Sequence, residues 1–150
     1  MKKVQSIGVV VFNGDAVLLV RSGPTASHFE GKNGLPSGKV ERDETNEEAA
    51  VRELSEETGL ITSIEDLHPI KTFTATIEQK QGPVTFVWHT FLCTKYEGTL
   101  SSSKETTPYW VKIGELSKIK NLLPNIETAV ELAKSVTPSG FEPEIFRMRT

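Results

Sequence analysis

The chain has 150 residues, of which 37% are hydrophobic and 25% charged, and its formal net charge at pH 7 is −3. This length suits one domain that buries about two thirds of its unfolded surface, and the composition is ordinary for a soluble globular protein. A membrane-spanning helix is excluded because no apolar run approaches about 18 residues, and a nucleic-acid binder would show a basic patch that is missing here. The single cysteine, Cys93, cannot form an internal disulfide, so we expect a cytoplasmic protein.

The first third of the chain predicts a β-hairpin, a loop and a short extended segment. Val4–Phe12 and Ala16–Arg21 are rich in β-branched and apolar residues, and the Asn-Gly-Asp sequence between them is a strong hairpin signal. Ser22–Asn33 is polar and contains glycine, which predicts a loop. Leu35–Val40 is expected to be extended because its proline disfavours a helix.

The next segment predicts a helix with defined ends. Thr45 can cap its N-terminus, and Glu48, three residues later, completes the capping-box pattern. Gly59 follows the periodic segment and suits its C-terminal end.

The remainder of the chain predicts three further strands and a second helix. Ile70–Gln79 and Val84–Lys95 are strand-like on either side of a turn, and Tyr109–Ile113 is a further strand after a polar loop. Pro124–Val136 carries apolar residues at helical spacing, whereas the tail Thr137–Thr150 has little periodicity and is either disordered or packed against a partner. Strands, helix, strands and helix in this order predict an α/β fold, with a mixed sheet and helices packed against it.

Acidic residues are concentrated in and before the first predicted helix. Between Glu41 and Glu57 there are eight acids and two arginines, a local sum of −6 that leaves +3 for the rest of the chain. At about 100° per residue, Glu53, Glu56 and Glu57 form a stripe along the border of the apolar face, where like charges repel. A divalent cation such as Mg²⁺ would offset this repulsion, because it binds carboxylate oxygens together with substrate phosphates. A solvated acidic helix face is the alternative.

Arg52 lies on another side of the predicted helix, beside Glu56 and one turn from Glu48. It can also reach back to Glu44, just before the helix, where a bidentate contact would tie the preceding loop to the helix. In that loop, Gly38 lets the backbone come close to a metal ion, to which its carbonyl oxygen could bind.

These residues together resemble the Nudix box, G-x5-E-x7-R-E-U-x-E-E-x-G-U, in which U is aliphatic. Gly38, Glu44 and the run RELSEETGL from Arg52 occupy every defining position. At average residue usage, a given start matches by chance on the order of one time in a billion. The chain departs from most family members at Ser37, where they have a second glycine.

The resemblance implies a Nudix-type α/β/α sandwich over residues 1–136, with 137–150 as a C-terminal tail. It also implies hydrolysis of a nucleoside diphosphate linked to another group, with Mg²⁺ or Mn²⁺ as the metal. By position, Glu56 and Glu57 resemble metal ligands, and Glu53 resembles a ligand that also orients or deprotonates the attacking water. Arg52 and Glu44 would support this catalytic group by clamping the loop.

Four positions other than the defining ones of the box are weaker candidates for site residues. The Lys-Glu pair ending at Glu105 is similar to one in MutT-type Nudix enzymes whose glutamate adds a metal ligand or assists the base, although a plain loop acid and Glu97 are alternatives. Arg21 and Lys39 could hold phosphate or be ordinary surface residues. Asn125 resembles the asparagine that reads the purine edge in MutT-type enzymes, and a helix-start role is its alternative.

The expected activity is that of a MutT-like nucleoside triphosphatase, which releases the monophosphate and pyrophosphate from ordinary or oxidised nucleotides. An ADP-ribose or nucleotide-sugar pyrophosphatase is the alternative substrate class, and a non-catalytic nucleotide sensor is the alternative of another kind. The expected partner is a small nucleotide, not a nucleic acid or a membrane, and the expected state is a monomer or homodimer.

Overall fold

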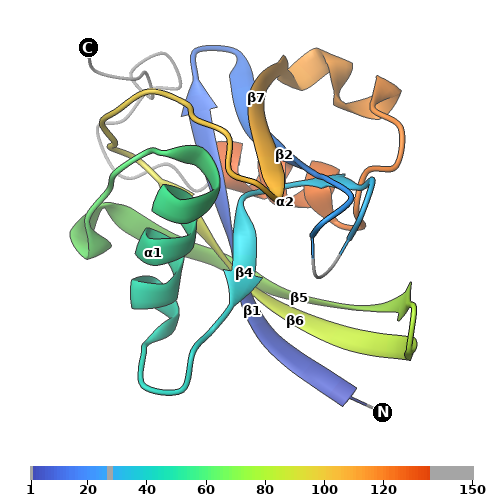
Figure 1. Cartoon of the computed structure of the whole chain (residues 1–150). Helices are drawn as coiled ribbons and strands as arrows, with labels where there is room; N and C mark the ends of the chain where they lie inside the picture. The colour runs from blue at the N-terminus through green and yellow to red at the C-terminus, as the bar shows by residue number, and fades with distance from the viewer. Residues whose placement is uncertain (1, 27–28, 136–150) are drawn as a thin grey trace.

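The computed structural model describes residues 2–26 and 29–135, in which seven strands form one mixed sheet (Figure 1). The strands are β1 (Lys2–Asn13), β2 (Ala16–Ser22), β3 (Asn33–Gly34), β4 (Ser37–Lys39), β5 (Leu67–Gln79), β6 (Gly82–Cys93) and β7 (Thr106–Lys112). Their order is β3-β2-β1-β6-β5, while β4 pairs with β1 and β7 pairs with β2. The β1–β6 pair is parallel and the other pairs are antiparallel, so the predicted mixed sheet is confirmed.

The two α-helices, α1 (Asn46–Thr58) and α2 (Ile126–Ser135), cover opposite faces of the sheet (Figure 1). Successive residues of a strand point to opposite faces, so β1 contributes to both sides. The core under α1 includes Ile7, Val9, Val11, Ala49, Ala50 and Leu54. The core under α2 includes Val10, Phe12, Leu92, Ala129, Val130 and Ala133. The two cores on one sheet make the α/β/α sandwich that the sequence predicted.

The ends of α1 are those that the sequence predicted. The Thr45 hydroxyl accepts a hydrogen bond from the Glu48 backbone N–H at 3.0 Å, and the Glu48 carboxylate accepts one from the Thr45 N–H at 2.8 Å. Gly59 ends the helix in a left-handed conformation, with φ of 85°. This conformation favours glycine, which explains the sharp end of the helix.

The boundaries of β7 differ from the prediction. The polar loop was expected to continue to Pro108, but β7 begins at Thr106 and pairs with β2 along its whole length, from Ser22↔Thr106 to Ala16↔Lys112. A proline is tolerated here because β7 has β2 as its only neighbour in the sheet, and an edge strand leaves alternate N–H groups unpaired.

Other differences are confined to ends and connections. β6 ends at Cys93, two residues before the expected Lys95. Two short 3₁₀ helices, η1 (Ile64–Asp66) and η2 (Ile113–Lys118), were not predicted, because segments of one or two turns carry too little periodicity to stand out. The predicted tail Thr137–Thr150 lies outside the described residues. Within the described part of the chain, the helices are all too short or too polar to cross a bilayer.

Candidate functional site

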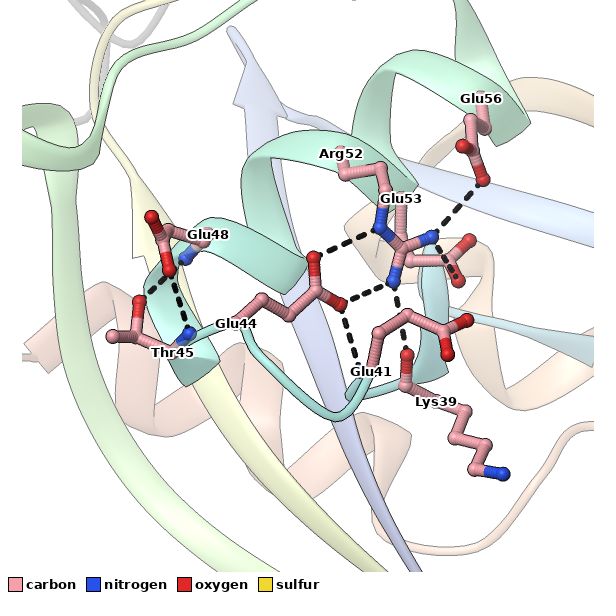
Figure 2. A network of polar contacts seen from close by, with 8 residues as sticks. All are labelled: Lys39, Glu41, Glu44, Thr45, Glu48, Arg52, Glu53 and Glu56. Atoms are coloured by element: carbon pink, nitrogen blue, oxygen red, sulfur yellow. Dashed lines mark hydrogen bonds and ion pairs between the residues drawn. The ribbon is translucent and has the colours of Figure 1, made fainter.

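Arg52 is the centre of a polar network that joins α1 to the loop before it (Figure 2). Its guanidinium donates from Nε to Glu44 at 3.0 Å and from Nη2 to the other Glu44 oxygen, which is the bidentate contact that the sequence predicted. Nη1 donates to Glu53 at 3.0 Å and to Glu56 at 3.1 Å, and Nη2 also donates to the Lys39 carbonyl at 3.0 Å. The loop between β4 and α1 is therefore fixed to the helix by one side chain.

The alternative partner considered for Arg52, Glu48, belongs instead to the helix cap. The Glu41 N–H donates to Glu44 at 2.8 Å, so Glu44 holds both the arginine and the loop backbone. The hydrogen bond and positive charge of Arg52 keep the pKa of Glu44 below its ordinary value.

Glu53 lies directly against β4, where Gly38 makes room for it. A Cβ atom added at Gly38 would stand 2.1 Å from Cδ and Oε2 of Glu53, closer than any real contact. The Glu53 side chain is only 14% exposed, and its burial raises its pKa although the neighbouring Arg52 opposes the shift. The box glycine therefore has a steric role, because a larger residue there would displace a carboxylate.

Among the described carboxylates, Glu57 has the largest shift in pKa. Its burial raises its pKa to about 8, the Ser37 N–H that donates to it at 2.9 Å opposes this, and the nearby charges of Glu53, Glu105 and Glu56 raise it further. A buried carboxylate without a full positive partner is costly in its ionised form.

The chemistry of these donors fits a hard divalent cation. They supply carboxylate oxygens around one cleft, and their burial leaves negative charge that a cation would offset. Among residues 2–26 and 29–135, no group of three or more His, Cys, Asp or Glu side chains is already arranged to hold a metal ion. Glu53 and Glu56 bond to Arg52, and Glu57 bonds to Ser37. Each of these hydrogen bonds uses one of the two oxygens of its carboxylate.

A cleft brings several of the predicted residues together. Its lining includes the predicted Gly38, Lys39, Glu53, Glu56, Glu57 and Glu105, together with Glu41. Five of these side chains are acidic and one is basic, so acidic groups predominate in the lining of the cleft. Glu41 was not singled out by the sequence reading, although it belongs to the acidic segment and stands three residues before Glu44.

The structure separates the two candidate acids of the polar loop. Glu105 lines the cleft and lies close enough to Glu57 to raise its pKa. Glu97 instead forms an isolated β-bridge with Ile61, away from the cleft. The spatial arrangement therefore favours Glu105 over Glu97 as an additional acidic group.

Arg21 is not brought to the cleft. Its neighbours Val20 and Ser22 line the cleft, and successive residues of β2 point to opposite faces, so Arg21 points to the other face. There its charge acts on Tyr109. A phosphate-binding role of Arg21 gains no support from this placement.

Asn125 lines a second, narrow pocket between the sheet and the start of α2. The pocket has an open volume of about 30 Å³, and its walls are Gly8, Leu35, Ser37, Phe73, Trp88, Thr90, Leu123, Pro124, Ile126 and Ala129. Asn125 adopts a φ of 72°, and its carbonyl accepts the Ala129 N–H at 2.9 Å, so it does begin the helix. Among the described residues, its side-chain amide has no hydrogen-bond partner, which leaves it available to a ligand.

The pKa shifts predict how stability without metal depends on pH. In the folded chain Glu57 holds its proton up to about pH 8, whereas in the unfolded chain it loses the proton near its ordinary value of 4.5. Between these values the folded state binds more protons, so its stability falls as pH rises, and Glu53 acts in the same direction. The lowered pKa of Glu44 has the opposite effect on stability, but this effect appears only at pH values below the ordinary range of a carboxylate.

We expect the Tm in chelator to fall between about pH 5.5 and pH 8.5, and millimolar Mg²⁺ to reduce that slope. A Tm in chelator that is flat or rises over this range would contradict the assignment.

Comparisons with known proteins agree on one family and one fold. The NUDIX domain family matches residues 2–132 of the chain. The 8-oxo-dGTP diphosphatase of Escherichia coli (strain K12) is 39% identical over 61 residues, which are 40% of this chain and 46% of that protein, so the match spans less than half of that relative.

Two solved structures show the likeness of fold. The MutT NUDIX hydrolase from Burkholderia pseudomallei has a TM-score of 0.73 at 21% identity and covers 91% of this chain and 100% of its own. The NUDIX domain of Shewanella oneidensis NrtR complexed with ADP ribose has a TM-score of 0.67 at 20% identity, over 90% of this chain and 88% of its own. At these identities, the structural matches show the fold alone.

Proposed function

The chain belongs to the NUDIX family, and on that premise we propose that it is a metal-dependent hydrolase of pyrophosphate bonds in nucleotides. The observation that carries the proposal is the acidic cleft, in which Glu53 and Glu57 are buried with raised pKa values beside Glu56 and Glu105. A non-catalytic sensor has no need to bury carboxylates at this cost. Perturbed carboxylates in a cleft are typical of catalytic sites.

The proposed metal is Mg²⁺ or Mn²⁺, held by Glu53, Glu56 and Glu57, with the Gly38 carbonyl and Glu105 as further oxygen donors. When bound, such a cation offsets the charge of the phosphates and makes a water molecule easier to deprotonate. Nudix hydrolases generally use divalent metal ions, which agrees with this donor set.

The residues of the chain have separate roles in the proposed reaction. Glu53 orients the attacking water or takes its proton, and its raised pKa makes it a stronger base than an ordinary carboxylate. Arg52 and Glu44 position Glu53 and the loop before α1. Lys39 lines the same cleft with an exposed side chain, where its charge can attract the substrate phosphates.

We propose that the substrate is a nucleoside triphosphate, ordinary or oxidised, cleaved to the monophosphate and pyrophosphate. Support comes from Asn125, whose amide is available in a pocket walled by Trp88 and Phe73, and from the partial match to an 8-oxo-dGTP diphosphatase. The pocket is too narrow for a purine as it stands, so its walls must move apart when a base enters. ADP-ribose is the second candidate, because a protein of similar fold is known in complex with it.

A panel of nucleotides distinguishes these possibilities. The protein is incubated with Mg²⁺ and, separately, with ordinary and oxidised deoxynucleoside triphosphates, ADP-ribose and dinucleoside polyphosphates, and the products are separated. We expect fastest turnover with a triphosphate, and monophosphate and pyrophosphate as products. Fastest turnover of ADP-ribose would assign the second candidate instead. Tight binding of a nucleotide without any turnover would overturn the enzyme assignment in favour of a sensor.

We also propose that the functional domain spans residues 1–136 and works in the cytoplasm as a monomer or homodimer. The cytoplasmic location rests on Cys93, which is buried and has no second cysteine to pair with. The proposed partner is the nucleotide itself, with no role for nucleic acid or a membrane.

A further inference from the structure

Ser37 lies where the acidic cleft meets the narrow pocket. Three residues line both cavities, and the other two, Leu35 and Leu123, are apolar. Ser37 therefore supplies the one polar side chain that the two cavities share within the described part of the chain. If a nucleotide bound with its phosphates in the cleft and its base at the pocket, its sugar would lie beside Ser37.

The register of the sheet shows which way the Ser37 side chain points. Ser37 pairs with Gly8 on β1, which pairs in turn with Thr90 on β6, and residues directly opposite one another project to the same face. That face carries the narrow pocket, which Gly8 and Thr90 also line. The next residue, Gly38, projects to the opposite face, toward Glu53.

The backbone and the side chain of Ser37 thus have different neighbours. Its backbone N–H donates to Glu57 at 2.9 Å, on the side of the carboxylates. Its hydroxyl, on the pocket side, has no hydrogen-bond partner among the described residues, and the residue is half-buried. An unpaired hydroxyl in a mostly apolar pocket is the kind of group that fixes the orientation of a ligand. The amide of Asn125 is the second such group in the same pocket.

On the basis of the proposed function, we propose that Ser37 is a specificity-determining residue whose hydroxyl binds the nucleoside part of the substrate. The same residue holds Glu57 through its backbone, which links nucleoside binding to the position of a proposed metal ligand.

The test compares Ser37→Ala and Ser37→Gly with the wild type in saturating Mg²⁺. The probes are deoxyguanosine monophosphate and adenosine monophosphate, which keep the base, sugar and first phosphate, and pyrophosphate, which has no nucleoside. We expect the Kd of at least one monophosphate to rise roughly three- to tenfold in both variants, the value of one lost hydrogen bond. The Kd of pyrophosphate and the Mg²⁺ dependence of its binding should remain those of the wild type, because both variants keep the backbone N–H that donates to Glu57.

Ser135→Ala is the matched control, because it removes an exposed hydroxyl at the far end of α2 whose one partner among the described residues is the Leu132 carbonyl. The proposal is overturned if both monophosphates bind Ser37→Ala as tightly as they bind the wild type, or if the wild type binds neither. It is also overturned if Mg²⁺ or pyrophosphate binding weakens in parallel, since Ser37 would then act only through Glu57. A wild type that binds a monophosphate through Ser37 but hydrolyses no nucleotide would refute the proposed function and leave this inference intact.

Discussion

Replacing Glu57 with glutamine is expected to lower kcat by about 100- to 1000-fold while making the metal-free protein more stable at alkaline pH. The loss of activity follows from the proposed metal site, because glutamine keeps the size of the side chain and its hydrogen bond to Ser37 but removes the charge of a proposed metal ligand. Electrostatic stabilisation by a bound metal supplies several kcal/mol of transition-state energy, and each 1.36 kcal/mol is tenfold in rate. Steady-state kinetics on the best nucleotide, across a Mg²⁺ titration, measure this loss.

The gain in stability has the same physical origin. The burial that raises the pKa of Glu57 to about 8 makes its ionised form unfavourable in the folded chain. Glutamine carries no charge to bury, so its Tm in chelator should exceed that of the wild type above about pH 8 and depend less on pH. Functional groups that lower the stability of the folded state are common at active sites.

Glu131→Gln is the control for both measurements, because Glu131 is exposed on α2 and pairs only with Lys134. It should change neither kcat nor the pH dependence of Tm. If Glu57→Gln kept full activity, or if it lowered the Tm in chelator at alkaline pH, Glu57 would not be a metal ligand held at a cost in stability.

The parts of the site that sequence predicted are those whose geometry is local. Thr45, Glu48 and Gly59 define the ends of α1 by hydrogen bonds within a few residues, and the structure has those bonds. The contact from Arg52 to Glu44 spans eight residues across one helix start, so helical spacing was enough to predict it.

The parts that sequence left open depend on how distant elements pack. Glu105 and Glu97 are equivalent in a loop, and only the pairing of β7 with β2 brings Glu105 beside Glu57. Arg21 and Val20 are adjacent, and which of them faces the cleft depends on the side of the sheet to which α1 binds. The orientation of the Ser37 side chain likewise required the register with Gly8.

The acidic stripe and the place of Arg52 beside Glu56 were predicted by angle around the helix. The structure adds a contact from Arg52 to Glu53, so that both carboxylates bond to the same guanidinium. Arg52 therefore offsets part of the repulsion between these neighbouring carboxylates.

Replacing Gly38 with alanine is the second change for which we expect a large effect, a fall in kcat of about 100-fold or more. The added Cβ would stand 2.1 Å from the Glu53 carboxylate, so the side chain of Glu53 must leave its place against β4. Displacement of a catalytic group by about 1 Å can cost about 100-fold in rate. Because Glu53 also bonds to Arg52, the Tm should fall as well. Kinetics and thermal unfolding of the same preparation measure the two effects.

Gly114→Ala is the matched control, because a Cβ at Gly114 meets no atom within 4 Å and its backbone is not in the left-handed region. This variant should keep both kcat and Tm, which separates the loss of a glycine from the loss of space beside Glu53. A shorter carboxylate needs less room, so Gly38→Ala combined with Glu53→Asp should lose less activity than the product of the two single effects. If Gly38→Ala retained wild-type kinetics, the steric role of the box glycine would be refuted, and with it the placement of Glu53 against β4 during catalysis.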